Sequence, residues 1–268
     1  MEIALLTDVF KRYSLEEALR LTWEAGFGAI ELNACFDWSP HIDFLQADAP
    51  RRVESLGRAL AELDLKLLAV ATYPNIAAIN EAVREQAVEY CLRAISLCKP
   101  LGCPLLTLMT SGSNLLPYEP QRAALEDSLR RLSAAAEGDM AIAIEVYPGN
   151  FIESTDEVLE LIDSLGLENV GYLLCVPHLA ALGEDIAEAY RKARGRVFHI
   201  HLADTPLATD SHLHLVPGTG DIEFGEFFDL LRTEYDRSLS IQIYSEAESP
   251  LASSRQSLEI VKQWLARR

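Results

Sequence analysis

The sequence lacks any long apolar run, and it is poor in positive charge. Its 268 residues include 23 Lys and Arg against 41 Asp and Glu, which gives a formal net charge of −18. A membrane span needs about 20 consecutive apolar residues, and strong acidity repels nucleic-acid phosphates and anionic lipid. We therefore expect neither nucleic acid nor a membrane surface as a partner, and we interpret the charge mainly as an aid to solubility.

Cysteine is also scarce. The five cysteines are an odd number, and no two of them form a Cys-x-x-Cys pair. Disulfide frameworks are typical of small secreted chains, so reduced thiols are expected here. The first ten residues, MEIALLTDVF, carry an acid at position 2 and only a short apolar run, unlike a signal peptide. Together these features predict a cytoplasmic protein.

The chain does contain a regular alternation of short apolar segments and longer amphipathic ones. Hydrophobic residues make up 49% of the chain, enough for a large core. Several apolar segments show no polar alternation, as expected for parallel strands that are covered on both faces. The predicted strands are 2–7, 28–32, 65–72, 103–110, 140–146, 170–175, 196–203 and 239–245. The predicted helices are 14–27, 50–63, 80–101, 120–137, 154–165, 184–194, 224–232 and 251–267.

Eight strand–helix units in a chain of this length predict a single (β/α)8 TIM barrel. An open, doubly wound α/β sheet is the alternative. No linker, low-complexity tract or break in composition divides residues 1–268, so we expect one domain. Active sites of TIM barrels lie at the carboxyl ends of the strands, and the residues there are the candidates for function.

Two strand ends carry residues that suit catalysis. Glu145 directly follows four apolar residues, where a carboxylate is costly to bury unless it is paired or bound to a metal. His199 and His201 are two residues apart and therefore share one face of their strand. We favour a site role for His201, with Asp204 close behind it, and a structural role for His199.

The segment NVGYLLCVPHL, residues 169–179, ends its apolar run at Cys175, with His178 three residues later. This pair is open to three interpretations, namely a metal ligand, a nucleophile with a nearby base, and simple packing. Further on, Gly218 and Gly220 do not form a dinucleotide-binding fingerprint and instead predict a turn that admits a ligand close to the backbone, with a phosphate-binding loop as the alternative.

His212 and His214 lie between strand seven and these glycines. We expect both to face mainly solvent, with His214 as a candidate for contact with a substrate.

Five segments carry a resemblance to a known family. They are GFGAIEL, AIAIEV, VGYLLCVPH, VFHIHLAD followed by VPGTGDIEF, and LSIQIYS followed by SLEIVKQWL. In this order and spacing, the chain resembles the xylose isomerase-like barrels over its whole length. That superfamily includes sugar isomerases, ketose 3-epimerases, inosose dehydratases and endonuclease IV.

The resemblance implies a metal site with two altered ligands. The epimerase and isomerase branches hold one divalent metal with a Glu, an Asp, a His and a Glu after strands five to eight. Glu145 and His201 match the first and third of these ligands, whereas Cys175 replaces the Asp and Gln242 replaces the second Glu. Mn²⁺ and Mg²⁺ prefer several carboxylates, so this set suits Zn²⁺ better, and a metal-free protein is the alternative.

The same substitutions affect the expected chemistry. Gln242 cannot exchange protons near neutral pH, which disfavours epimerisation by two carboxylate bases. Glu145 remains as a single base, assisted by His178 or His201, which suits isomerisation through an enediol or elimination of water. Glu246 could replace the missing carboxylate if the last strand ended differently.

The sequence therefore predicts an isomerase or epimerase of a sugar or polyol, with Glu145, His178 and His201 as catalytic residues. The predicted substrate-binding residues are Glu31, Tyr147, Asp204, His214 and Gln242. A dehydratase and a non-catalytic carbohydrate-binding protein or complex subunit are the alternatives. A nuclease like endonuclease IV is disfavoured because too few ligands are present for three zinc ions. A homo-oligomer is compatible with the resemblance.

Overall fold

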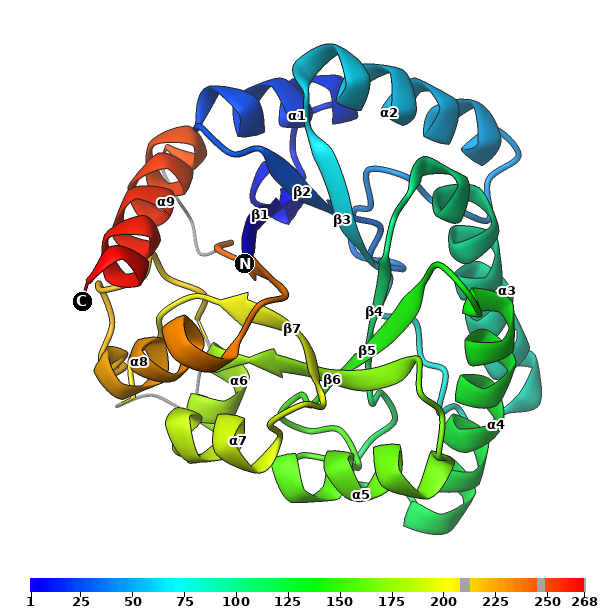
Figure 1. Cartoon of the computed structure of the whole chain (residues 1–268). Coiled ribbons are helices and arrows are strands. Elements are labelled where there is room, and N and C mark those ends of the chain that lie inside the picture. Colours follow the sequence, from blue (N-terminus) through cyan, green and yellow to red (C-terminus); the bar gives the residue numbers. More distant parts are fainter. Residues whose placement is uncertain (208–212, 245–248, 268) are drawn as a thin grey trace.

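The computed structural model describes residues 1–207, 213–244 and 249–267. Its strands form one closed parallel barrel in chain order, which confirms the predicted TIM barrel (Figure 1). Strand β1 pairs with both β2 and β8, so the open sheet is excluded. The strands are β1 Glu2–Leu6, β2 Ala29–Asn33, β3 Lys66–Ala71, β4 Leu105–Met109, β5 Ala141–Glu145, β6 Val170–Cys175, β7 Val197–Leu202 and β8 Ser238–Ile241.

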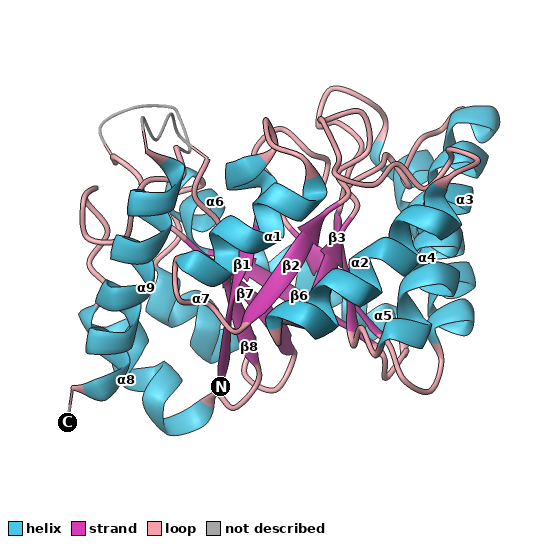
Figure 2. Cartoon of the chain, turned by 90° about the horizontal axis from the view of Figure 1, so that it is seen from above, coloured by secondary structure: helices cyan, strands magenta, loops and turns pink. Residues whose placement is uncertain are grey.

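Helices surround the barrel (Figures 1 and 2). They are α1 Leu15–Glu24, α2 Ala49–Leu63, α3 Glu81–Cys98, α4 Tyr118–Ala136, α5 Thr155–Leu165, α6 Val176–Ala181, α7 Ile186–Lys192, α8 Gly225–Glu234 and α9 Pro250–Ala266. Two short 3-10 helices, η1 Thr7–Phe10 and η2 Lys99–Leu101, complete the list. The predicted strands and helices are present with small shifts at their ends. Helix α6 and the two 3-10 helices were not predicted.

Local sequence explains where several helices begin and end. Ser14 and Ser154 each form a capping box with a Glu three residues later, so backbone N–H groups of the first turn have acceptors. Asn80 caps α3 in the same position. Helix α5 ends at Gly166, which adopts a left-handed conformation with φ of 62°.

The core has two parts, and the second one positions the site. Most buried apolar side chains lie between the strands and the surrounding helices. Inside the barrel, smaller apolar groups such as Ala4, Ala29 and Leu68 form separate layers. Buried polar residues, including Glu31, Thr107 and His201, lie among these layers. The interior of the barrel is therefore partly polar, which is unusual for a core that serves packing alone.

All five cysteines are buried and free, as expected for reduced thiols. Among the helices that the structure describes, none combines the length and the apolar character that a bilayer crossing requires.

Candidate active site at the carboxyl ends of the strands

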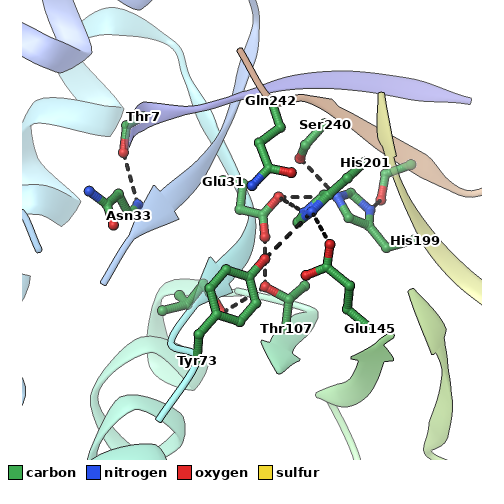
Figure 3. A network of polar contacts seen from close by, with 12 residues as sticks. Thr7, Glu31, Asn33, Tyr73, Thr107, Glu145, His199, His201, Ser240 and Gln242 are labelled. Atoms are coloured by element: carbon green, nitrogen blue, oxygen red, sulfur yellow. Dashed lines mark hydrogen bonds and ion pairs between the residues drawn. The ribbon is translucent and has the colours of Figure 1, made fainter. Parts of the chain in front are cut away.

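Strand register brings the predicted ligand positions to one end of the barrel. Cys175, the last residue of β6, lies opposite His201 of β7. Glu145 ends β5, and Gln242 directly follows β8, where its backbone N–H donates to Leu202 of β7 at 3.0 Å. The side chains of Glu31, Glu145, His201 and Gln242 point toward one another in Figure 3.

Glu31 is the centre of a buried hydrogen-bond network (Figure 3). Thr107 donates its hydroxyl to Oε1 of Glu31 at 2.7 Å, and His201 Nε2 lies 2.9 Å from Oε2. Burial alone would raise the pKa of Glu31, but the charge and hydrogen bonds of His201 and His199 outweigh it and hold the pKa well below its usual range. Glu31 therefore stays ionised and fixes the orientation of the His201 ring.

His201 has a carboxylate on each side. Besides Glu31 at Nε2, it has Oε1 of Glu145 at 3.5 Å from Nδ1. Burial alone would lower the pKa of His201, but the two carboxylates raise it to about 10. His199, in contrast, is held between the hydroxyls of Ser238 and Ser240 at 2.9 and 2.8 Å, which supports the structural role predicted for it.

Glu145 is fully buried, and its two oxygens differ. Oε1 lies 3.0 Å from Nδ1 of His178 and 3.5 Å from Nδ1 of His201. Within the described residues, no hydrogen bond reaches Oε2. Burial would raise the pKa of Glu145, but the nearby His178 and His201 lower it below its usual range. The carboxylate is therefore ionised and has one oxygen available to accept a proton.

Helix α6 explains the Cys-x-x-His spacing. Cys175 ends β6, and α6 begins at the next residue with Pro177 in its first turn, a position that proline favours. The single helical turn brings His178 back beside Cys175. Burial, followed by the Glu145 carboxylate, raises the pKa of the Cys175 thiol well above its ordinary value. A thiol in that state is a poor nucleophile, which disfavours that interpretation.

His214 is fully buried, so the expectation that it faces mainly solvent is wrong. The loop after β7 turns back on itself, and Leu215 forms an antiparallel bridge with Asp204. This places Nδ1 of His214 3.0 Å from the backbone oxygen of Gln242 and its ring against that of Tyr244. Its Nε2 lies 3.4 Å from Nε2 of His178. His212 and Glu246 lie outside the described residues.

Asp204 organises this loop, and it is not among the residues that line the pocket. Its Oδ1 accepts the backbone N–H groups of Thr205 and Ile222, and its Oδ2 accepts that of Gly218. Gly220 passes so close that a Cβ there would lie 2.5 Å from Oδ1. Direct contact of Asp204 with a substrate therefore finds no support in its position, and the tight turn predicted at the glycines serves the loop itself.

We expect Asp204→Ala to reduce the free energy of unfolding by about 2–4 kcal/mol, because three backbone N–H groups, one of them buried, would lose their acceptor. Urea denaturation followed by circular dichroism measures this change. Asp221→Ala is a matched control, since exposed Asp221 accepts one backbone hydrogen bond within the described residues, from Leu207. Equal losses for the two variants would contradict the structural role of Asp204.

A narrow pocket opens above the network. Its lining residues are Asp8, Lys11, Asn33, Cys35, Trp38, Tyr73, Met109, Tyr147, His178, Gln242 and Tyr244. The lining includes Tyr147, His178 and Gln242, three of the predicted site residues, whereas Glu145 and His201 lie directly behind His178 and Tyr73. Tyr73 has a φ of 48°, an uncommon value for a tyrosine, and its hydroxyl lies 3.5 Å from Nδ1 of His201.

The sequence reasoning did not select the residues on the opposite side of this pocket. Lys11 lies over the rings of Trp38 and Tyr244, at 5.6 and 5.9 Å from their centroids. Burial raises the pKa of Asp8 to about 7, and its Oδ1 accepts no hydrogen bond within the described residues. Asp8 follows β1, so its position at the end of a strand could have identified it as a site residue. Lys11 and Trp38 lie in loops, where the sequence pattern does not distinguish site residues from other residues.

Three of the four predicted metal ligands have converging donor atoms. Each of the three residues offers one donor atom, and these atoms lie within 4.8 Å of one another; the residues are Glu145, Cys175 and His201. Oε1 of Gln242, the fourth, is buried without a hydrogen-bond partner among the described residues. A buried carbonyl oxygen of this kind is expected where its partner is an ion or a ligand.

The comparison with protein families agrees with this geometry. Residues 19–265 match the family model described as xylose isomerase-like TIM barrel. The chain belongs to this family. A D-psicose 3-epimerase of Enterocloster bolteae is 30% identical over 52% of this chain and 50% of its own length, so the match spans half of that relative. An inosose dehydratase of Clostridium perfringens is 26% identical over 68% of this chain and 70% of its own length.

Solved structures of similar fold cover this xylose isomerase-like barrel completely. The crystal structure of IolI protein with a bound zinc atom superposes with a TM-score of 0.81 at 19% identity, and the match covers 100% of each chain. The relatives are therefore sugar epimerases and inosose dehydratases, and at least one protein of this fold binds zinc.

Proposed function

We propose that this protein is an isomerase or epimerase of a sugar or polyol, and that Glu145 abstracts a proton from the carbon next to a carbonyl. The observation that carries this proposal is the state of the Glu145 carboxylate. It is buried and ionised, both imidazole contacts are made to Oε1, and Oε2 accepts no hydrogen bond within the described residues. An ionised carboxylate with one unengaged oxygen is suited to general base catalysis.

Two histidines would support the base in different ways. His178 both lines the pocket and contacts Oε1 of Glu145, so it can move a proton between the pocket and the carboxylate. His201 is held in place by Glu31 and presents Nδ1 to the same oxygen. The hydroxyl of Tyr73 reaches His201 from the pocket wall and is a further candidate to hydrogen-bond a substrate oxygen.

The pocket lining suits a polyhydroxylated ligand. The lining combines aromatic rings of Trp38, Tyr147 and Tyr244 with hydrogen-bonding groups of Asp8, Asn33 and Gln242. A few polar groups placed among aromatic walls fix the orientation of a small ligand. The D-psicose 3-epimerase and the inosose dehydratase among the relatives have names that point to the same ligand class.

The donor set fits a divalent metal of the zinc type. Glu145, Cys175 and His201 would hold it, with Oε1 of Gln242 as a fourth ligand, and Glu31 would orient His201 from behind. When bound, such an ion supplies a Lewis acid for a substrate carbonyl. With a thiol and an amide in place of two carboxylates, the site favours Zn²⁺ over Mn²⁺ or Mg²⁺.

Dehydration of a sugar-like or cyclitol substrate is the second candidate function. The substitution at Gln242 favours it, because a single carboxylate base suffices to remove a proton before water is lost. In an epimerase of the usual kind, a second base must return the proton on the opposite face. The two functions differ in the step after proton abstraction by Glu145: an epimerase or isomerase returns a proton to the substrate, whereas a dehydratase releases water.

The test is a screen of ketoses, inososes and sugar acids with purified protein, with and without added Zn²⁺ or Mn²⁺. We expect at least one compound to be converted to an isomer, whereas a product lighter by one water would identify a dehydratase. If a compound binds tightly but no product forms under any of these conditions, the protein is a non-catalytic binding protein and the proposal fails.

A further inference from the structure

A second group of metal-binding side chains lies beside the group that contains His201. Cys175, His178 and His214 each offer one donor atom, and these three atoms lie within 4.8 Å of one another. All three residues are buried. Thiolate and imidazole are preferred ligands of zinc, and three protein ligands are typical of zinc sites that keep one position open.

The spacing of the two imidazoles matches a zinc ion. Nε2 of His178 lies 3.4 Å from Nε2 of His214. Zn–N bonds of about 2.0–2.1 Å in a tetrahedral arrangement place two nitrogen ligands about 3.3 Å apart. An ion could therefore bind both nitrogens with little movement of either ring.

The hydrogen bonds on the other side of each ring determine which nitrogen faces the ion. Nδ1 of His214 lies 3.0 Å from the backbone oxygen of Gln242. Nδ1 of His178 lies 3.2 Å from the backbone oxygen of Val146 and 3.0 Å from Oε1 of Glu145. Carbonyl and carboxylate oxygens only accept, so each Nδ1 carries a hydrogen, and each Nε2 is the ring nitrogen that faces the other histidine.

An ion bound by both Nε2 atoms would take the place of this close contact between two nitrogens. A histidine that binds zinc almost always donates its other ring N–H to a carbonyl or carboxylate, which is the arrangement of both rings here. The sulfur of Cys175 lies within 4.8 Å of one nitrogen of each ring and would supply the thiolate ligand.

The three ligands are held rigidly by their surroundings. Helix α6 fixes His178 one turn after Cys175, and the ring of Tyr147 packs edge-on against His178 at 4.8 Å. The ring of Tyr244 stacks on His214 at 4.3 Å with an interplanar angle of 26°. Ligands fixed in this way need little reorganisation on binding, which favours a defined metal site.

We propose that Cys175, His178 and His214 bind a zinc ion, at a position that shares only Cys175 with the set of Glu145, Cys175 and His201. Binding forms an S–Zn bond and releases the thiol proton to the buffer, with no change of oxidation state. The thiolate and the Glu145 carboxylate, which contacts His178, together balance the two positive charges. His178 lines the pocket, so the ion would lie at the pocket wall.

The test uses Co²⁺ as a spectroscopic substitute for zinc, on the full chain. The wild-type protein should show thiolate-to-cobalt charge-transfer absorption, and it should bind zinc in competition with a chromophoric chelator. His178→Asn and His214→Asn should each abolish the absorption and weaken zinc binding at least about 100-fold, since even changes outside the ligand shell cost 10–100-fold. Cys175→Ser should abolish the absorption as well.

Two variants serve as matched controls. His201→Asn removes the histidine of the other set, and Cys35→Ser removes another buried thiol that lines the pocket. Both should keep the absorption, which reports an ion at Cys175, His178 and His214. Near-ultraviolet circular dichroism verifies the fold of each variant. The cobalt absorption spectrum of the wild-type protein tests the proposal even if a variant does not fold.

The absence of charge-transfer absorption in the wild-type protein would overturn the proposal. Retention of the absorption in His214→Asn together with its loss in His201→Asn would overturn it too, and would assign Cys175 to the other set. Neither readout involves turnover, so the result is independent of the role proposed for Glu145.

Discussion

Replacing Glu145 with Gln is expected to reduce kcat/KM by about 10²–10⁴-fold on any substrate that the screen identifies, the range over which a positioned general base contributes. Gln keeps the size of the side chain and an oxygen that can accept the hydrogen bond of His178, but it cannot take up a proton. The loss should fall mainly on kcat, because the pocket walls are unchanged. Steady-state kinetics of the wild-type protein and the variant give kcat and KM separately.

Glu160→Gln is the matched control for this substitution. Glu160 lies exposed on α5, and its replacement removes the same charge without touching the pocket. We expect its kcat/KM to equal that of the wild type. An active Glu145→Gln variant with unchanged kcat would show that another group abstracts the proton.

The double variant Cys175→Asp with Gln242→Glu is expected to bind Mn²⁺ at least about tenfold more tightly than the wild type, because ligand charge count sets the affinity for hard cations. It places two further carboxylates beside Glu145 and His201 and removes the thiol, a ligand that favours zinc. It should also gain epimerisation, since the carboxylate introduced by Gln242→Glu would act as a second base. Calorimetric titration with Mn²⁺ and Zn²⁺ measures the shift in preference.

Gln46→Glu is the control for the added charge, because Gln46 is exposed on the surface and its side chain hydrogen-bonds only Asp43 within the described residues. Its metal affinities should match those of the wild type. If the double variant folds but its Mn²⁺ affinity does not rise, the residues after β6 and β8 do not contribute to the metal position that we assign to them.

The sequence was sufficient to predict the barrel because the fold depends on a repeated pattern. Strand β6, residues 170–175, is buried at every position and reads as a continuous apolar run. Each such run is followed by a helical pattern, and eight repeats allow few other architectures. The exact ends of elements depend on local caps, such as the left-handed Gly166 after α5, and the predicted ends differ from the observed ones by up to four residues.

The convergence of Glu145, Cys175 and His201 could also be predicted, because parallel strands bring their carboxyl ends to one edge. Strand register then decides which residues are neighbours, and the pairing of Cys175 with His201 follows directly from it. Glu31 was expected near the substrate, but it lies deeper, bonded to Thr107 and His201. A pattern of strands does not reveal such depth, because the stagger of a barrel is a property of the closed sheet.

The position of His214 could not be predicted, since it depends on tertiary contacts of a loop. The bridge between Asp204 and Leu215 and the stacking of Tyr244 bury this residue, which belongs to none of the predicted helices or strands. In the same way, the single turn of α6 is too short to produce a helical pattern, yet it brings His178 to Cys175 and Glu145. Loops and short turns thus complete a site that the strands only outline.

Proton abstraction by Glu145 is tested most directly by solvent isotope incorporation. The wild-type protein and Glu145→Gln are incubated in D₂O with the ketose or inosose that binds best, and the hydrogen next to the carbonyl is followed by NMR. We predict deuterium at that carbon with the wild-type protein and no incorporation above background with the variant. Incorporation at equal rates in both proteins, or none in a wild-type complex that is fully formed, would contradict the assignment of Glu145 as the base.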